Sequence, residues 1–199
     1  MPETMPGTRP GLDAAAAEVA ALLNGVDDGE LGRPTPCPEY TVGDLLAHLM
    51  DLTLAFRDAA EKAGGPTAPP DPSAARLDPR WRVLLPARLD ALAAAWRDPA
   101  AWEGETEAGG VVLPASVMGL VALDELVIHG WDLARATDQP FVCDRSTAEP
   151  LLAFLTRAAE ETGGRGTEGM FGPVVPVPED APPLDRAVGL AGRDPAWKP

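Results

Sequence analysis

The feature that most constrains this chain is a long segment with almost no hydrophilic face. The stretch "PASVMGLVALDELVIHGWDLARAT", residues 114–137, predicts one long helix, with Pro114 in its first turn, where a missing N–H is tolerated. Up to Asp124 the segment is apolar on nearly every side. Such a helix is stable in water only when other helices surround it. The sequence therefore predicts an all-α fold with this helix in its core.

Four further segments carry apolar residues at helical spacing and supply those neighbours. They are residues 12–24, a helix opening at Thr41 and running through Phe56, residues 79–96 with Pro86 as a point of bending, and a helix from Ser146 or Thr147 to Gly163. Thr41 and Asp44 form a capping-box-like pair. Turn signals across residues 98–113 make 104–113 a candidate for a small hairpin. Together with the long helix they predict an all-helical bundle with extra short helices. Its core comes from the first, second and fourth helices and from either the third or the fifth.

The last part of the chain has a different composition. Residues 165–199 are rich in Pro and Gly, with "PVVPVPEDAPP" expected to be extended and "LDRAVGLAG" a short helix. We therefore divide the chain into a helical bundle at 1–164 and a C-terminal tail at 165–199. The tail is expected to pack on the bundle or to extend from it.

Charge and cysteine content limit the classes of partner. The formal net charge is -15, from 16 basic and 31 acidic residues, which disfavours nucleic acid and anionic membranes. No secretory signal is visible, and the apolar run at 111–123 is too short to span a bilayer. These features predict a cytoplasmic protein. Cys37 and Cys143 lack metal-ligand spacing and are expected as free thiols, with their roles left open.

The candidate chemistry lies at the only two histidines. Glu125 and His129 are four residues apart, so both side chains lie on one helix face, roughly 6 Å apart along the axis. On a helical wheel, His48 falls about 80° from the centre of its helix's buried stripe, and so can face the interior. Two histidines and one carboxylate form a three-ligand set with open positions, which suits a catalytic divalent metal. Asp132 could orient the His129 ring, Asp124 could face solvent, and Trp131 is a candidate for the pocket wall.

Two simpler interpretations fit the same residues. His48 could be a hydrogen-bonded core histidine, with Glu125 and His129 forming an ordinary helical ion pair. An unpaired buried glutamate is costly, but either a metal or a protonated histidine would remove that cost. The chain has no GxSxG, Walker or GxGxxG motif that would indicate another chemistry.

Two motifs resemble a known family. "TPCPEYTVGDLLAHLMDL" and "LDELVIHGWDLARATDQP" resemble the N-terminal domain of mycothiol-dependent maleylpyruvate isomerase, in the DinB/YfiT-like superfamily. The end, "FGPVVPVPEDAPPLDRAVGLAGRDPAW", resembles a stand-alone actinobacterial subgroup of small metal-binding proteins. The resemblance implies a DinB-like four-helix bundle that holds a divalent metal, zinc or nickel, through His48, Glu125 and His129.

The resemblance also implies an activity. Relatives transfer low-molecular-weight thiols such as mycothiol, and a metal-bound thiol loses its proton and attacks a small electrophile. The family's isomerases have a second domain that contributes to the reaction, and we expect this chain to lack it. The expected function is therefore a mycothiol-dependent thiol transferase or isomerase, or alternatively a non-catalytic metal- or ligand-binding module. A homodimer is compatible with the resemblance. The sequence alone assigns no catalytic residue, substrate or physiological metal.

Overall fold

The computed structural model describes residues 9–64, 72–167 and 170–199. Its longer elements are α1 (Asp13–Leu22), α2 (Val42–Glu61), α3 (Trp81–Ala95), β1 (Glu105–Ala108), β2 (Val111–Pro114), α4 (Ala115–Ala136), α5 (Arg145–Thr162) and α6 (Pro183–Leu190). Short 3₁₀-helices stand between them: η1 (Leu23–Gly25), η2 (Asp28–Glu30), η3 (Ala74–Arg76) and η4 (Pro99–Trp102). The described part is thus mostly helical with one small hairpin, as the apolar periodicity predicts.

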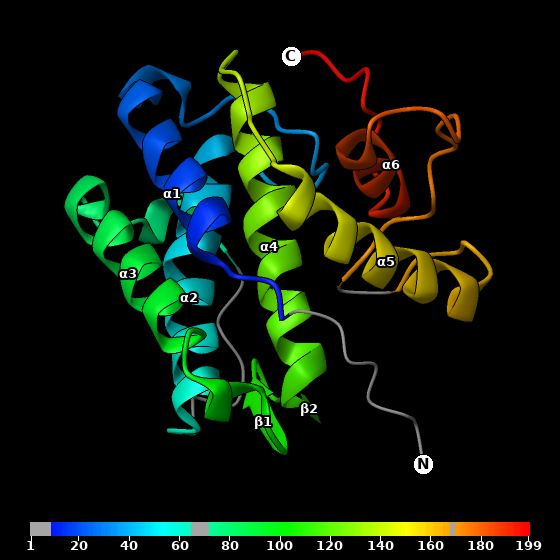
Figure 1. Ribbon diagram of the computed structural model, residues 1–199. Helices are drawn as coiled ribbons and strands as arrows, with labels where there is room; N and C mark the ends of the chain where they lie inside the picture. Colours follow the sequence, from blue (N-terminus) through cyan, green and yellow to red (C-terminus); the bar gives the residue numbers. More distant parts are fainter. Residues whose placement is uncertain (1–8, 65–71, 168–169) are drawn as a thin grey trace.

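Helices α1 to α4 form the main body of the molecule. Helix α2 packs against α3 and α4, and α1 packs against the same two helices from the other side. Figure 1 shows these four helices side by side, with the β1–β2 hairpin at one end and α5 and α6 to one flank. Pro86 lies inside α3, which is continuous from Trp81 to Ala95.

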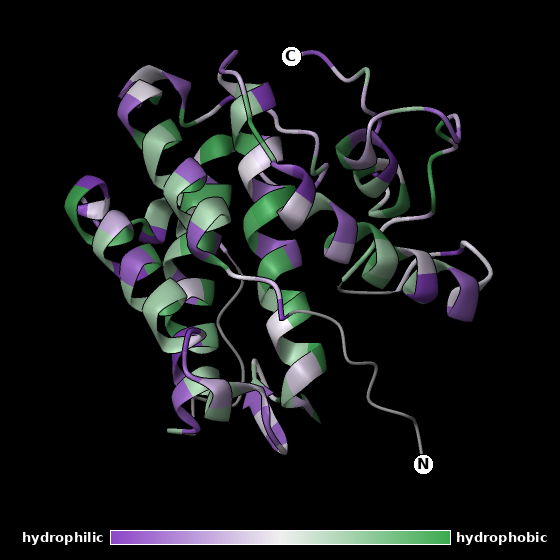
Figure 2. Ribbon diagram, in the orientation of Figure 1, coloured by the Kyte–Doolittle hydropathy of each residue, from purple (hydrophilic) through white to green (hydrophobic). Residues whose placement is uncertain are grey.

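Helix α4 is central because its side chains are buried almost all the way round. Leu123, Leu126 and Leu133 are completely enclosed, and hydrophobic colour predominates along this helix in Figure 2. Burial of leucine side chains on this scale contributes about 2 kcal/mol each. Polar residues on α4 must therefore find partners inside the protein.

The N-terminus of α2 is fixed by the predicted capping box. The Thr41 hydroxyl accepts a hydrogen bond from the Asp44 backbone N–H at 3.3 Å, and the Asp44 carboxylate accepts one from the Thr41 backbone N–H at 3.0 Å. This pair sets where the helix begins. It thereby determines which face of α2 carries His48, about two turns further along.

The β1–β2 hairpin packs against one end of α2 and one end of α4. Strands β1 and β2 are antiparallel, with Thr106 opposite Leu113 and Glu105 opposite Pro114. The Thr106 hydroxyl donates a hydrogen bond to the Ala59 carbonyl, which attaches the hairpin to α2. Pro114 was expected in the first turn of the long helix. It instead ends β2 and directly precedes the helix, because Pro114 and the residues before it pair across the hairpin, with Pro114 opposite Glu105.

The C-terminal residues fold back onto the helices. Helix α6, where the sequence predicts a short helix, packs against α5. The Val175 N–H donates to the Gly189 carbonyl at 2.9 Å, and the Arg135 guanidinium donates to the Trp197 carbonyl at 2.8 Å. These bonds bring the end of the chain beside α4. Within the described ranges, no helix has both the length and the apolar character needed to cross a bilayer.

Candidate metal centre

Three side chains from two helices converge at one point. Nε2 of His48, on α2, lies 3.1 Å from Oε2 of Glu125, on α4, and Nε2 of His129 lies 3.3 Å from the same oxygen. One ligand atom from each residue lies within 4.8 Å of the other two. The structure thus brings together the three residues that rarity and spacing single out. The same contacts, His48 with Glu125 and Glu125 with His129, also match the simpler interpretation of a hydrogen-bonded histidine beside a helical ion pair.

Helical geometry explains why these three residues meet. Glu125 and His129 are one turn apart on α4, so their side chains project in the same direction. His48 lies at the edge of the apolar face of α2, which packs against α4. Its side chain is 21% exposed and that of Glu125 is 24% exposed, so the site opens to solvent on one side.

Asp132 holds the ring of His129 from behind. Its Oδ2 lies 3.0 Å from Nδ1 of His129, and its side chain is completely buried. Histidines that bind metals commonly donate the second ring N–H to a carboxylate in this way. The contact directs Nε2 of His129 towards Glu125 and His48.

A buried arginine from the C-terminal segment reaches the same carboxylate. Nη2 of Arg193 lies 3.4 Å from Oδ2 of Asp132, and its Nη1 donates to the Ala191 carbonyl at 2.8 Å. Arg193 follows Gly192, which has a φ of 83° and packs directly on the backbone of Gly172. A Cβ at Gly192 would lie 2.6 Å from the Gly172 Cα, so this approach requires glycine.

Tyr40 covers the histidines from the loop before α2. The Thr35 hydroxyl contacts the Cys37 and Tyr40 carbonyls at 2.9 and 2.8 Å, which fixes the loop "TPCPEY". The Tyr40 ring centroid lies 5.3 Å from that of His48 and 6.0 Å from that of His129. Burial raises the pKa of Tyr40 to about 12, with the negative charges around it adding to the effect. The hydroxyl is therefore protonated at neutral pH and can donate a hydrogen bond.

The site's electrostatics oppose the effect of burial. Burial alone would raise the pKa of Glu125, but hydrogen bonds from His129 and His48 hold it well below its usual range. Burial alone would lower the pKa of His129, but Asp132 and Glu125 raise it to about 9. Without a metal, a proton on His129 therefore satisfies the two carboxylates. A metal ion at this point would take that proton's place.

Two residues beside the triad are buried. Asp124, which could have faced solvent, is only 5% exposed, and burial raises its pKa to about 8. It is buried because α4 is covered by its neighbours almost all the way round. Trp131, a candidate either for the pocket wall or for the core, lies in the hydrophobic core and lines neither cavity at the site.

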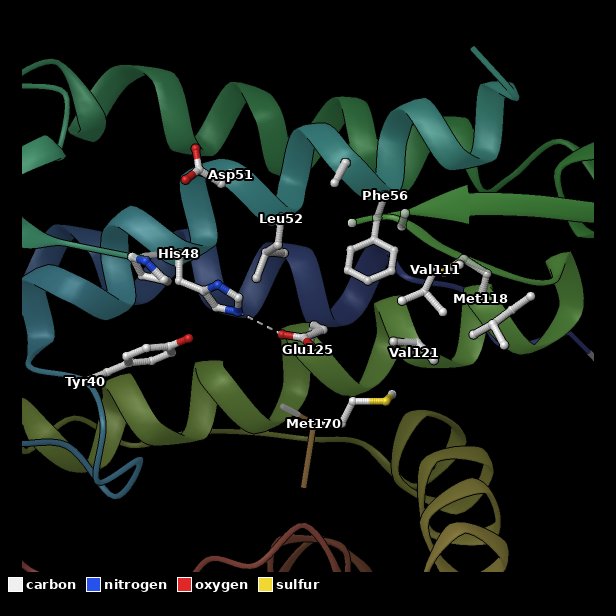
Figure 3. A pocket seen from close by; sticks show the side chains of 15 residues that line it. Tyr40, His48, Asp51, Leu52, Phe56, Val111, Met118, Val121, Glu125 and Met170 are labelled. Carbon is white, nitrogen blue, oxygen red and sulfur yellow. Dashed lines mark hydrogen bonds and ion pairs between the residues drawn. The ribbon is translucent and has the colours of Figure 1, made fainter. Parts of the chain in front are cut away.

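Two cavities meet at Glu125, His48 and Tyr40, which line both of them. One, of about 330 Å³, extends along α2 and α4 under the hairpin and is lined mainly by apolar side chains (Figure 3). The other, of about 390 Å³, lies between the Cys37–Tyr40 loop and the C-terminal segment and includes His129 and Arg193. We call them the apolar cavity and the polar cavity. The triad thus has access to ligands from two directions.

The spacing of the three donor atoms is compatible with a shared divalent ion. Two of their separations, 3.1 and 3.3 Å, are close to the roughly 3.3 Å expected between ligands about 2.0–2.1 Å from a tetrahedral zinc ion, and all three atoms lie within 4.8 Å of one another. Two imidazole nitrogens and one carboxylate oxygen also leave at least one coordination position for a further ligand. Imidazole and carboxylate donors suit zinc and nickel alike, so the donor set does not select between them.

Tyr40 and Arg193 were not selected from the sequence. Tyr40 is the chain's only tyrosine, so the argument from rarity that singles out the histidines would also have singled it out. Arg193 lies 61 residues after Asp132, and no local spacing connects the two. The only signal was one arginine in the apolar stretch "VGLAGRDPAW".

The fold is helical, and two histidines and a glutamate form a possible metal site where two cavities meet. This combination defines the class as helical proteins with a candidate metal site. Sequence comparison names the family. The mycothiol maleylpyruvate isomerase N-terminal domain model matches residues 12–134, more than half of the chain. The chain therefore belongs to the mycothiol maleylpyruvate isomerase N-terminal domain family, which confirms the resemblance seen in its two motifs.

The chain is also similar to two curated relatives and to two solved structures. Uncharacterized proteins from two strains of Mycobacterium tuberculosis are each 32% identical over 185 residues, covering 87% of this chain and 91% of their own length. The crystal structure of a mycothiol-dependent maleylpyruvate isomerase aligns with a TM-score of 0.57 at 20% identity, covering 75% of this chain and 69% of the isomerase chain. A mutant of that enzyme aligns with a TM-score of 0.56, at the same identity and coverage. At this identity the structures show a shared fold.

Proposed function

We propose that this protein binds one divalent metal ion through His48, Glu125 and His129 and uses it to activate a low-molecular-weight thiol. The thiol is mycothiol or a close relative, and the reaction is transfer to, or isomerisation of, a small electrophile. In this proposal residues 1–164 form the DinB-like bundle that carries the site, and residues 165–199 form a tail that closes one side. A cytoplasmic location stays a prediction from the sequence.

The observation that carries the proposal is the convergence of three ligand atoms where two cavities meet. When bound, an ion with an open position lowers the pKa of a thiol that occupies it, which makes the thiolate available at neutral pH. One cavity can then hold the thiol and the other the electrophile. The family's name, which refers to a mycothiol-dependent isomerase, supports the choice of thiol.

The surrounding residues orient and polarise this site. Asp132 keeps the proton of His129 on Nδ1, so that Nε2 is free to bind the ion. Tyr40 presents a protonated hydroxyl to both cavities and can donate to negative charge that develops on the electrophile. Arg193 balances the charge of Asp132, which would otherwise be a buried carboxylate facing a single imidazole.

The test combines metal analysis with thiol consumption. Untagged protein should contain about one zinc or nickel ion per chain, and His129→Ala should contain almost none. The loaded protein should accelerate consumption of mycothiol by an electrophile, whereas His129→Ala should not. Asp90→Asn is the control, because Asp90 is exposed on α3 and lines neither cavity. Metal-loaded protein that accelerates no thiol reaction would contradict the enzymatic part of the proposal.

One observation favours a second candidate, a non-catalytic metal- or ligand-binding module. The matching family model describes an N-terminal domain, and this chain aligns with 69% of the solved isomerase. A binding module would retain metal and bind mycothiol without consuming it. Titration calorimetry with mycothiol, run beside the consumption assay, distinguishes the two functions.

A further inference from the structure

The apolar cavity has a composition that restricts what it can hold. Its wall is formed largely by carbon side chains of α2, α4 and the hairpin: Leu52, Ala55, Phe56, Val111, Leu113, Met118 and Val121. Figure 3 shows Phe56, Val111, Val121 and Met118 grouped at the end away from His48 and Glu125. A ligand that reaches the triad from this side therefore has an apolar body next to one polar end.

The charges around this cavity are all of one sign. Asp51 and Glu125 line it, and no lysine or arginine does. All 16 basic residues of the chain fall within the described ranges, so none is available from the residues outside them. A carboxylate in this cavity would lose hydration and would find no lysine or arginine in the wall to pair with, which is costly.

The cavity mouth is apolar as well. Val111 is 53% exposed and Met170 is 46% exposed, and both line the cavity. Exposed large apolar side chains beside a cavity are characteristic of a ligand entrance. The polar cavity differs, because Arg193 and Glu39 line it together with Cys37 and the backbone of residues 172–173.

We propose that the apolar cavity selects an uncharged, apolar electrophile, so that the substrate of this protein is not a dicarboxylate such as maleylpyruvate. The inference rests on the proposed function and specifies its substrate class. An uncharged α,β-unsaturated ester or ketone has the required chemistry. Its carbonyl end reaches Tyr40 and the triad, and its apolar part lies along Phe56 and Val121.

The reaction needs no oxidant or reductant. The thiol gives its proton to solvent, and the thiolate sulfur forms a bond to the β-carbon as the C=C π pair moves to the α-carbon. The α-carbon then takes a proton from solvent, which leaves a thioether. If instead the carbanion rotates about the Cα–Cβ bond before it is protonated, its electron pair re-forms the C=C bond as the C–S bond breaks. The departing thiolate then regains a proton from solvent, and the net result is a cis–trans isomer and a regenerated thiol.

A binding experiment tests the charge preference without relying on catalysis. Dimethyl succinate and succinate share a carbon skeleton, differ by two charges, and cannot react with thiols. Ligand-observed NMR with the full chain, metal-free and zinc-loaded, should detect binding of the diester to both forms. The diester should bind about tenfold more tightly than the dianion to the metal-free form. Equal or tighter binding of succinate to that form would overturn the inference, as would no binding of the diester.

Two adjacent valines provide a variant and its matched control. Val111 and Val112 are both exposed on β2, but only Val111 lines the cavity. Val111→Lys adds a cation at the mouth and should reduce the preference for the diester about fivefold, whereas Val112→Lys should leave it unchanged. Equal shifts in the two variants would show a general surface-charge effect and would overturn the inference.

The kinetic version uses dimethyl maleate and maleate with mycothiol. After subtraction of the uncatalysed rate, the zinc-loaded protein should favour the diester in kcat/KM by about tenfold or more. If neither compound is consumed, the proposed function fails, and the succinate pair still decides the charge preference of the cavity. If maleate is consumed faster than its diester, the proposed function stands and the substrate class is wrong.

Discussion

The two cavities beside the triad differ both in chemistry and in origin. The apolar cavity is built mainly from α2, α4 and the hairpin, which pack against one another in the main body of the molecule. The polar cavity is built from a loop before α2 and from the C-terminal segment, which are more than 120 residues apart in sequence. The comparison teaches that one side of the site comes from helical periodicity, and the other from the way the end of the chain folds back.

The largest expected effect is on the candidate metal ligands, which lie where the two cavities meet. His48→Ala and His129→Ala should each weaken binding of zinc by more than about a hundredfold, since the loss of an outer partner alone costs 10- to 100-fold. Calorimetry of untagged protein measures this loss, with Asp90→Asn as the control that should bind zinc normally. Comparable binding by either alanine variant would show that the cavities do not meet at a metal centre.

The next largest expected effect is on zinc binding and comes from a change in the polar cavity alone. Arg193→Met removes the cation that supports Asp132 and should weaken zinc binding by about tenfold, because Asp132 would then orient His129 less firmly. Binding of dimethyl succinate in the apolar cavity should be unchanged. Arg186→Met, on α6 and away from the site, is the matched control. A parallel loss of both ligands would indicate that the two cavities are not independent.

Asp124 gives a smaller effect that depends on pH. Because burial raises its pKa to about 8, the folded protein binds this proton more tightly than the unfolded chain, whose pKa is about 4. The stability that protonated Asp124 contributes is therefore fully present below pH 4 and is lost as the pH rises towards 8. Asp124→Asn cannot ionise and should avoid that loss.

Thermal unfolding of metal-free protein measures this difference. At pH 8 Asp124→Asn should have the higher Tm, by several degrees if each kcal/mol moves the Tm about 3 °C in a chain of this size. At pH 4 the two proteins should unfold at nearly the same temperature. Asp90→Asn, exposed on α3, is the control and should show no such pH dependence. A lower Tm for Asp124→Asn at pH 8 would contradict the assignment.

The smallest effect concerns the thiol in the polar cavity. Burial raises the pKa of Cys37, and Arg193 partly offsets this rise, so less thiolate is present at pH 7 than in a free cysteine. Iodoacetamide should alkylate Cys37 several-fold more slowly than a cysteine peptide, and more slowly still in Arg193→Met. Mass spectrometry of quenched samples gives the rates. Faster labelling than the peptide would show that Cys37 is an activated thiol.

Much of the fold was predictable because the apolar residues are local and periodic. The Thr41–Asp44 cap, the stripe along α2 and the four-residue spacing of Glu125 and His129 are all short-range patterns. They predict the helices and bring the three candidate ligands onto facing surfaces. Pro114 was misplaced by one element, since a proline before a helix can equally well end a strand.

The remainder of the site depends on contacts between distant residues. The partnership of Arg193 with Asp132 requires the close approach of Gly192 and Gly172, which the composition of the tail does not reveal. Asp124 could have faced solvent, as carboxylates usually do, but the side of α4 that carries it is covered by other parts of the protein. Burial of a polar residue is decided by what surrounds the helix, and a linear pattern does not show this.

The most direct test of the central claim is zinc X-ray absorption spectroscopy on the untagged protein, reduced with a phosphine and without added thiol. We predict a first shell of nitrogen and oxygen at about 2.0–2.1 Å, multiple-scattering features of two imidazoles, and loss of one imidazole in His48→Ala. A sulfur shell near 2.3 Å would instead place the metal at Cys37 or Cys143. A spectrum of hydrated zinc, unchanged by the variant, would contradict a metal centre at His48, Glu125 and His129.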